Sequence, residues 1–415
     1  MIQETRIALK NAGRIDPSSI EDYMNSGGFK AFKKALSMDP RNVIKEMKNS
    51  GLRGRGGGGF PSGKKLEFTD QARCHKCGPK FIVCNADEGE PGTYKDRIIM
   101  EQDPYIMLEG MLISAYSIWA EKGYIYIRRE YTESIQKLEQ AIKNCYDQGY
   151  LGENIQGSGF SLDIELKIGA GSYLCGEELT LLESLEGKRG YPRIKPPFPA
   201  NVGVFGQPTL INNVETFANI PYIITEGSEA YKKMGTERSP GTKIFTISGD
   251  IENPGTYEVE MGVTLKQLIY ELAGGMKNGK PFKAAILGGA AGTFVNEEAF
   301  DIPMGFDTLK EIGAILGSGA IMVMDETRSL YDMMHSILEF FEHESCGKCV
   351  PCRVGTRMLV MMLKDVKEKK NGNRAEMLEK MKEEAEYMQK TSLCPLGGSP
   401  ILPIGSAVQF FKDEF

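Results

Sequence analysis

Residues 81–94 read FIVCNADEGEPGTY, a short apolar run that ends in an asparagine and a group of carboxylates. The run at 81–84 predicts a buried strand, because a short apolar segment bounded by polar turn residues is typical of one. The acidic and glycine residues that follow then lie at the carboxyl end of that strand, where open α/β sheets bind ligands. This stretch therefore predicts both an α/β fold and a ligand site.

The residues beyond this stretch alternate between helix and strand patterns. Residues 105–121 predict a buried helix, 124–127 a strand, 132–146 an amphipathic helix and 162–168 a further strand. A strand–helix–strand order is typical of a parallel sheet covered by helices. We therefore expect an α/β fold with a parallel sheet over about residues 50–225.

The rest of the chain predicts two further units. Residues 244–248 and 257–260 flank a turn and predict a hairpin, followed by a helix at 264–273 and a strand at 284–289. This order favours a compact β-grasp domain. From residue 330 onward the pattern is mostly helical, and residues 364–390 are typical of a solvated amphipathic helix pair.

Composition excludes several classes of protein. The chain has 415 residues, of which 41% are hydrophobic and 26% charged, an ordinary soluble mixture. Its net charge of −6 offers no general attraction to nucleic acid or anionic lipid. No uncharged apolar run approaches the ~18 residues of a membrane span, and the first residues are charged where a signal peptide is apolar. We expect a cytoplasmic protein with no nucleic-acid partner and no direct membrane insertion, which reaches a membrane only through partners.

Four of the nine cysteines form the strongest chemical signal. Cys346, Cys349 and Cys352 are each separated by two residues, and Cys394 follows farther along the chain. Three closely spaced thiolates and one remote thiolate match the ligand requirement of a [4Fe-4S] cluster. A Cys₄ zinc site is the alternative, although it usually pairs two Cys-x-x-Cys motifs. We therefore expect an iron–sulfur cluster rather than disulfides.

The other five cysteines carry weaker signals. Cys74 and Cys77 form an isolated Cys-x-x-Cys, for which we expect a surface loop with incidental thiols, and a redox or auxiliary metal site is the alternative. Cys84, Cys145 and Cys175 are expected to be packing residues.

A glycine-rich stretch at residues 51–65 reads GLRGRGGGGFPSGKK. The spacing of Gly54, Gly56 and Gly59 matches the dinucleotide fingerprint, but residues 43–49 before it look helical, so a conventional Rossmann turn is disfavoured. Lys65 stands where a phosphate-binding P-loop needs Ser or Thr for magnesium, which disfavours ATP hydrolysis. Exposed backbone N–H groups beside several cations nevertheless predict an anion cradle, with a flexible surface loop as the alternative.

Two acidic segments accompany this loop. Residues 84–94 and 169–178 each follow a predicted strand, and both contain several carboxylates. Such side chains suit ribose hydroxyls and amides rather than phosphates. Together with the cysteine cluster, they indicate a nucleotide cofactor that supplies electrons to iron–sulfur.

Six ordered motifs and a final cysteine segment reveal a resemblance to a known family. They are SGLRGRGGGGFPSGKK, CNADEGEPGTYKDR, GAGSYLCGEE, KPPFPA, INNVET, SCGKCVPCR and SLCPLG, spread from about residue 50 to 400. The chain resembles the NADH-binding flavoprotein subunit of respiratory complex I and its relatives in NAD-linked, electron-bifurcating hydrogenases and formate dehydrogenases. The resemblance implies a helical lead-in (1–45), a Rossmann-like FMN/NADH domain (46–228), a β-grasp, SLBB-like domain (240–328) and a helical [4Fe-4S] domain (329–415).

The resemblance also implies roles for individual residues. The cluster ligands would be Cys346, Cys349, Cys352 and Cys394. The flavin and its phosphate would be held by Gly54, Arg55, Gly56, Lys65, Asn85, Asp87, Tyr173, Gly176, Glu177, Glu178, Asn212, Asn213 and Thr216. For the nicotinamide nucleotide, Phe60, Phe68 and Phe198 would stack or pack against it, and Glu88 and Glu90 would hold its polar groups. The alternative for the three phenylalanines is simple core packing.

The function implied by the resemblance is NADH oxidation, or NAD⁺ reduction, within a multisubunit oxidoreductase. A hydride passes between NADH and FMN, and single electrons pass to the cluster, so no side chain need act as an acid–base catalyst. A thioredoxin-like [2Fe-2S] subunit and a further iron–sulfur or catalytic subunit are the expected partners, because the extra cluster domains of the hydrogenase relatives are not expected in this chain. An NADPH-using relative and a non-catalytic scaffold that retains the fold are the alternatives.

Overall fold

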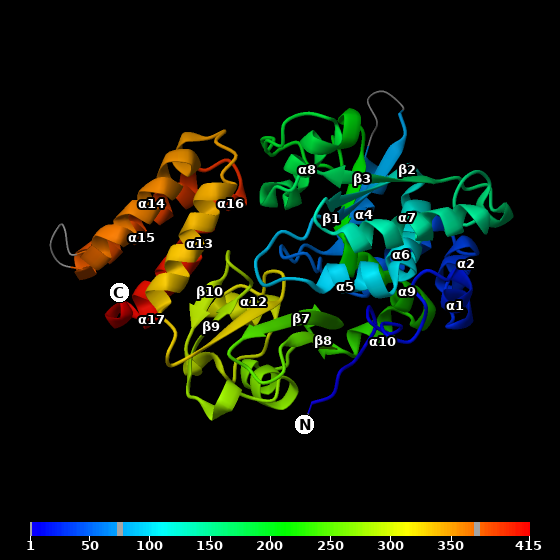
Figure 1. Ribbon diagram of the computed structural model, residues 1–415. Helices are drawn as coiled ribbons and strands as arrows, with labels where there is room; N and C mark the ends of the chain where they lie inside the picture. Colours follow the sequence, from blue (N-terminus) through cyan, green and yellow to red (C-terminus); the bar gives the residue numbers. More distant parts are fainter. Residues whose placement is uncertain (1, 73–77, 369–373) are drawn as a thin grey trace.

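The computed structural model describes residues 2–72, 78–368 and 374–415, and the described chain forms three units (Figure 1). An α/β unit is followed by a smaller mixed sheet and then by a group of C-terminal helices, drawn in orange and red (Figure 1). This arrangement confirms the predicted fold class. The Cys74/Cys77 pair lies outside the described residues.

The first sheet has four parallel strands, β1 (Lys80–Ala86), β2 (Ala120–Arg128), β3 (Asp163–Gly169) and β4 (Thr209–Asn213). Their order is β3-β2-β1-β4. The chain passes from β1 to β2 to β3 in one direction and then places β4 on the other side of β1. Ligands bind parallel sheets at such a reversal, beyond the carboxyl ends of the two strands.

Helices cover both faces of this sheet, because the two central strands, β1 and β2, carry buried apolar residues on both sides. Ile82 and Cys84 face a core built mainly with α6, in which every residue is buried, whereas Phe81 and Val83 face α8. Cys84, Cys145 and Cys175 are buried, as predicted. The covering helices are α5 (Lys95–Gln102), α6 (Pro104–Ile118), α7 (Thr132–Asp147), α8 (Glu178–Leu185), α9 (Val214–Glu226) and α10 (Ser228–Lys232).

The N-terminal helices pack against the core of this unit. The carboxylate of Glu109, in α6, accepts hydrogen bonds from the Tyr23 hydroxyl (2.5 Å) and from the backbone N–H groups of Phe29 (2.9 Å) and Phe32 (3.0 Å). All three aromatic side chains are fully buried. The helices of this region are α1 (Ile20–Asn25), α2 (Lys30–Leu36), α3 (Pro40–Asn49), which confirms the helix expected before the glycine-rich stretch, and α4 (Ser62–Gln71).

The second unit is a five-stranded mixed sheet in the order β10-β9-β11-β7-β8. Its hairpin of β7 and β8 and its next strand β9 confirm the sequence prediction, and β11 pairs with β7 in parallel. The predicted helix begins with a capping box at Thr264, forms α11 (Leu265–Gln267) and continues as one π-helical turn. The strands are β7 (Thr242–Gly249), β8 (Gly255–Glu260), β9 (Phe282–Leu287), β10 (Thr293–Val295) and β11 (Ala320–Asp325), with α12 (Phe306–Glu311) before β11 and a small ribbon of β5 (Gly235–Thr236) and β6 (Ser239–Pro240) before β7.

The third unit consists of helices packed around an apolar core that includes Leu338, Phe341, Leu359, Leu363 and Met388. The segment at 364–390, predicted as an amphipathic helix pair, covers the last turn of α14 and most of α15, so the first helix begins well before the prediction. None of the helices in the described part of the chain has the length and hydrophobicity needed to cross a bilayer. The helices are α13 (Leu330–Glu344), α14 (Val350–Glu368), α15 (Arg374–Thr391), α16 (Pro395–Gly398) and α17 (Ile401–Phe410).

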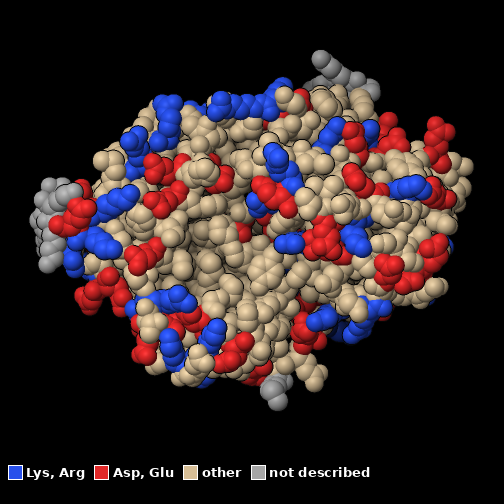
Figure 2. Space-filling view, in the orientation of Figure 1, with Lys and Arg blue, Asp and Glu red and all other residues tan. Residues whose placement is uncertain are grey.

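Acidic and basic side chains are interspersed among the described residues of the face drawn in Figure 2. Neither sign dominates that face, as expected for a chain of small net charge. A protein that binds nucleic acid through its phosphates typically carries a basic patch or stripe instead.

Candidate functional site

The carboxyl ends of β1 and β4 bring three of the predicted asparagines together. In the register of the two strands, Asn85 pairs with Asn213 and Cys84 with Asn212. The Asn85 side chain donates to the Gly176 carbonyl (2.8 Å) and accepts from the Asp87 N–H (3.1 Å). The buried Asn212 side-chain nitrogen has no hydrogen-bond partner among the described residues. A buried unpaired donor is costly, so this amide is available for a ligand acceptor.

The glycine-rich stretch lies directly against this end of the sheet. Its ends are joined by hydrogen bonds from the Gly54 N–H to the Phe60 carbonyl and from the Ser62 N–H to the Leu52 carbonyl, each 2.9 Å long. At Gly56, a Cβ atom would lie only 2.8 Å from Cβ of Asn213. Only a glycine therefore allows the backbone this approach. The loop has the close backbone approach that an anion cradle needs.

Two lysines and two glutamates border this loop. The Lys65 ammonium lies 3.1 Å from the Ile211 carbonyl and 3.5 Å from Glu178, and Lys195 pairs with both Glu177 (3.0 Å) and Glu178 (2.9 Å). Burial alone would raise the pKa of Glu178, but the two lysines outweigh it and lower that pKa. Glu178 is therefore ionised at neutral pH, and Lys65 keeps part of its surface exposed beside the loop.

The Arg55 side chain contacts residues of α10 and β6. Its guanidinium is fully buried and donates to the Tyr231 hydroxyl (3.0 Å) and the Pro240 carbonyl (2.7 Å). Its backbone N–H donates to the Thr216 hydroxyl (2.8 Å). Arg55 and Thr216 thus hold the loop from behind. Side-chain direction at this position is not readable from the sequence.

The two glutamates expected to hold the nucleotide differ in their surroundings. Glu88 is buried and accepts from the backbone N–H groups of Asp96 (2.9 Å) and Arg97 (3.1 Å), so the chain's own donors occupy its carboxylate. Burial, reinforced by the nearby Asp96 charge, raises the pKa of Glu88 to about 7. The Glu88 carboxylate therefore binds the first N–H groups of α5, where a negative charge is favourable.

Glu90, in contrast, connects the parallel-sheet unit to the mixed-sheet unit, and its partner Tyr173 contacts the third unit. It accepts from the Tyr173 hydroxyl (2.6 Å) and from the Ala291 N–H of the second unit (3.0 Å). The Tyr173 N–H donates in turn to Glu344, at the end of α13 (3.0 Å). Burial raises the pKa of the Glu90 carboxyl, and burial also raises the pKa of Asp87 to about 7. The acidic loop therefore meets the cysteine-bearing helices.

The three predicted phenylalanines lie on the surface. Phe60, Phe68 and Phe198 have 45%, 48% and 53% of their surface exposed. These fractions exclude simple core packing as their explanation. Exposed aromatic rings of this kind are available for stacking against a planar ligand.

The four predicted cluster ligands come from three places in the third unit. Cys346 and Cys349 lie between α13 and α14, Cys352 lies in the first turn of α14, and Cys394 caps α16. Gly347 adopts a left-handed φ of +74°, which lets the chain wrap between the first two cysteines.

Burial and two backbone N–H groups act in opposite directions on the pKa of the Cys394 thiol. Burial raises the pKa of Cys394 to about 11, against the opposing effect of the Leu396 and Gly397 N–H groups. A bound metal is what stabilises thiolates in such a setting. The buried Ser392 hydroxyl has no hydrogen-bond partner among the described residues, and a Cβ at Gly397 would contact both Ser392 and Cys352.

Among residues 2–72, 78–368 and 374–415, no three or more His, Cys, Asp or Glu side chains are placed to hold a single metal ion. The preference for a cluster over a zinc ion therefore rests on the spacing of the four cysteines in the sequence.

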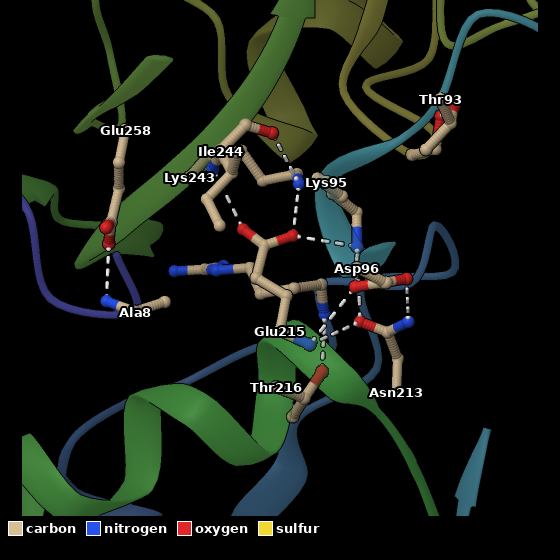
Figure 3. Close-up of polar contacts among 12 residues, drawn as sticks. Ala8, Thr93, Lys95, Asp96, Asn213, Glu215, Thr216, Lys243, Ile244 and Glu258 are labelled. Carbon is tan, nitrogen blue, oxygen red and sulfur yellow. Dashed lines mark hydrogen bonds and ion pairs between the residues drawn. The ribbon is translucent and has the colours of Figure 1, made fainter. Parts of the chain in front are cut away.

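Sequence reasoning missed a buried ionic cluster next to Asn213, drawn in Figure 3. It consists of Lys95, Asp96, Glu215 and Lys243, whose side chains are almost completely inaccessible. The only signal in the sequence is that charged residues follow the acidic motif and the Asn212-Asn213 pair. Which charges meet inside the protein depends on the tertiary fold.

Three family models match the chain. The Nuo51 FMN-binding domain matches residues 47–222, the SLBB domain matches residues 244–290, and the NADH-ubiquinone oxidoreductase-F iron-sulfur binding region matches residues 332–415. These segments correspond to the parallel sheet, the mixed sheet and the cysteine-bearing helices.

Similar proteins span nearly the whole chain. The F 2 subunit of the NADH-quinone oxidoreductase of Rhizobium meliloti is 43% identical over 99% of this chain and 96% of its own length. HndC, a subunit of the NADP-reducing hydrogenase of Solidesulfovibrio fructosivorans, is 44% identical over 100% of this chain and 83% of its own.

A solved structure agrees with these relatives. The NAD⁺-reducing [NiFe]-hydrogenase in its H₂-reduced state matches 99% of this chain with a TM-score of 0.85 and 32% identity, although the match spans only 66% of that hydrogenase chain. The chain therefore belongs to the family of NADH-oxidising FMN and iron–sulfur subunits that includes the F subunits of NADH-quinone oxidoreductases and subunits of NAD-linked hydrogenases.

Proposed function

We propose that this chain holds FMN at the β1/β4 reversal. The observation that carries the proposal is the unpaired Asn212 amide, which lies at the end of β4 next to a glycine loop that packs against Asn213. The amide would donate to the flavin, and the loop backbone together with Lys65 would hold its phosphate. The other flavin contacts are proposed at Gly54, Gly56, Asn85, Asp87, Tyr173, Gly176, Glu177 and Glu178.

The nicotinamide nucleotide is proposed to lie over the exposed phenylalanines Phe60, Phe68 and Phe198. Of the two acidic candidates, Glu90 is the better one, because Glu88 is buried whereas Glu90 keeps part of its surface exposed. A carboxylate suits a ribose hydroxyl and repels a 2′-phosphate, which favours NADH over NADPH. The relative HndC is named for NADP, so this preference needs a direct test. We expect NADH to reduce the bound flavin faster than NADPH does.

The residues of the chain supply binding and orientation. When bound, FMN takes a hydride from NADH and a [4Fe-4S] cluster takes up single electrons. Asn212 and the glycine loop orient the flavin, and Glu90 and Tyr173 hold the acidic loop against the third unit. No side chain is required to move a proton, and the proposed cluster ligands are Cys346, Cys349, Cys352 and Cys394.

We further propose the setting in which the chain works. Its relatives are named as subunits, so electrons leave this chain for a partner. A thioredoxin-like [2Fe-2S] subunit and a further iron–sulfur or catalytic subunit are the proposed partners, at a cytoplasmic location. The boundaries 46–228, 240–328 and 329–415 are proposed for the three domains.

The proposal is tested by titrating the purified chain with FMN and monitoring binding through the change in flavin fluorescence. Asn212→Ala should weaken FMN binding by about 2- to 10-fold, because it removes one neutral hydrogen bond. Asn42→Ala, an exposed position on α3, is the matched control and should bind as the unaltered chain does. An unaltered chain that binds no FMN would contradict the proposal and would favour the non-catalytic scaffold.

A further inference from the structure

The buried ionic cluster of Lys95, Asp96, Glu215 and Lys243 joins the two sheets of the protein. The Glu215 carboxylate lies 2.5 Å from the Lys243 ammonium and 3.0 Å from that of Lys95, and Lys95 lies 2.6 Å from Asp96. Lys95 and Asp96 begin α5, Glu215 lies in the first turn of α9, and Lys243 lies in β7 of the mixed sheet. Three elements from two units therefore share one set of charges (Figure 3).

Lys243 fixes Glu215 from the side of the mixed sheet. One carboxylate oxygen of Glu215 meets the Lys243 ammonium, and the other accepts the Ile244 N–H (2.8 Å). The Lys243 ammonium also donates to the Ile244 carbonyl (2.9 Å). Because two successive residues of β7 hold both oxygens, the position of this strand determines the position of Glu215.

The other end of the cluster holds the proposed flavin site. The Asn213 side chain donates to Asp96 (2.6 Å) and accepts from Lys95 (3.3 Å) and from the Glu215 N–H (3.0 Å). Both ends of this amide are therefore used by the cluster. Asn213 is also the residue against which the Gly56 backbone packs.

A second connection runs through the residue after Glu215. The Thr216 hydroxyl accepts the Arg55 N–H of the glycine loop (2.8 Å), and the Arg55 guanidinium donates to the carbonyl of Pro240 (2.7 Å), two residues before β7 begins. The loop backbone is therefore hydrogen-bonded to α9, and the Arg55 side chain is hydrogen-bonded to the segment just before β7. A displacement of Glu215 would therefore move both Asn213 and the glycine loop.

We propose that Lys243 is a positioning residue for the flavin site, which acts through Glu215 on Asn213 and on the glycine loop. The seating of the mixed sheet against the parallel sheet thereby sets the geometry of the flavin-binding edge. This inference rests on the proposed function. It goes beyond it because Lys243 lies in a different domain from the proposed flavin contacts and has its ammonium bound to Glu215 and to its own strand.

The test measures FMN binding and the midpoint potential of bound FMN in the full-length chain. Lys243→Met keeps the length of the side chain and removes its charge, and it should weaken FMN binding at least tenfold. The loss of a buried positive charge should also lower the midpoint potential of the bound flavin, since an electron-rich reduced flavin loses a favourable field. A tenfold greater loss for reduced than for oxidised FMN corresponds to about 30 mV for a two-electron couple.

Lys280→Met is the matched control. Lys280 belongs to the same mixed-sheet unit and pairs with Asp325 (2.9 Å), and its removal should change FMN binding less than twofold. Lys243→Arg, which restores the charge, should recover most of the binding and the potential. If Lys243→Met fails to fold, the double variant Glu215→Gln with Lys243→Met decides, because it leaves neither partner of the pair charged and unpaired.

Three outcomes are distinguished. Weaker FMN binding with a lower potential in Lys243→Met, or weaker FMN binding in the double variant, supports the inference. Binding and potential equal to those of the unaltered chain overturn the inference while the proposed function stands. Failure of the unaltered chain to bind FMN overturns both.

Discussion

Gly56→Ala is the substitution whose effect follows most directly from the structure. The new Cβ would lie 2.8 Å from Cβ and 3.2 Å from Cγ of Asn213, and ordinary contacts begin at 3.4 Å, so the loop must move by about 0.6 Å. Asn213 cannot yield easily, because Asp96, Lys95 and the Glu215 N–H hold its amide. Relieving such a clash costs about 1–3 kcal/mol. Part of the cost appears as lower stability, and the displaced cradle loses FMN affinity by up to about 5- to 150-fold.

The assay is FMN titration of the purified variant, accompanied by thermal unfolding without flavin. Gly405→Ala, in α17, provides a control outside the loop, because its Cβ meets only Cδ1 of Ile401, at an ordinary distance of 3.9 Å, and its backbone is not in the left-handed region. It should retain FMN affinity within about twofold. Equal losses in the two variants, or full affinity in Gly56→Ala, would refute the argument that the close approach to Asn213 shapes the site.

Three further predictions concern the acidic loop, the cluster and the core. Glu90→Gln keeps atoms that can hydrogen-bond to Tyr173 and Ala291 but removes the negative charge. The apparent KM for NADH in steady-state kinetics should therefore rise about fivefold while FMN stays bound. An unchanged KM would count against the role of Glu90. Cys394→Ala should lose the visible absorption of the cluster and most of the iron in a metal assay, whereas full iron content would refute its assignment as a ligand. Asp103 has its pKa raised by burial to about 7 from 3.8, so the folded state binds this proton more tightly than the unfolded chain, and stability should fall as pH rises from about 4 to about 7. In Asp103→Asn, which keeps the helix cap, chemical denaturation should show a smaller fall over this window, and an identical pH profile would contradict the shift.

Much of the fold could be predicted because local patterns and tertiary packing agree. The strands at 81–84 and 124–127 and the helix between them are strongly apolar and buried, whereas the strand at 162–168 was predicted from its alternating pattern and is only partly buried. β4 was not predicted, because its five residues are short and end in two asparagines. That strand creates the reversal in strand order, so the position of the ligand site became clear only from the pairing of β4 with β1.

The chemistry of single residues could be predicted only in part. The sequence motifs identified the asparagines, the glycine loop and the cysteines, because few other structural roles explain these residue types at these spacings. The side-chain directions of Arg55 and Glu88 depend on partners far away in the sequence, such as Pro240 and the start of α5. The pairing of Glu215 with Lys243 likewise depends on how two sheets meet, which no local pattern records.

The central claim, that one chain holds a flavin reduced by NADH together with an iron–sulfur cluster, is tested most directly by an anaerobic titration of the reconstituted protein with NADH. We predict that the visible absorption of oxidised flavin bleaches and that the cluster becomes reduced, as followed by its electron paramagnetic resonance signal. Flavin absorption that NADH leaves unchanged, or protein without acid-labile sulfide after anaerobic preparation, would contradict the account.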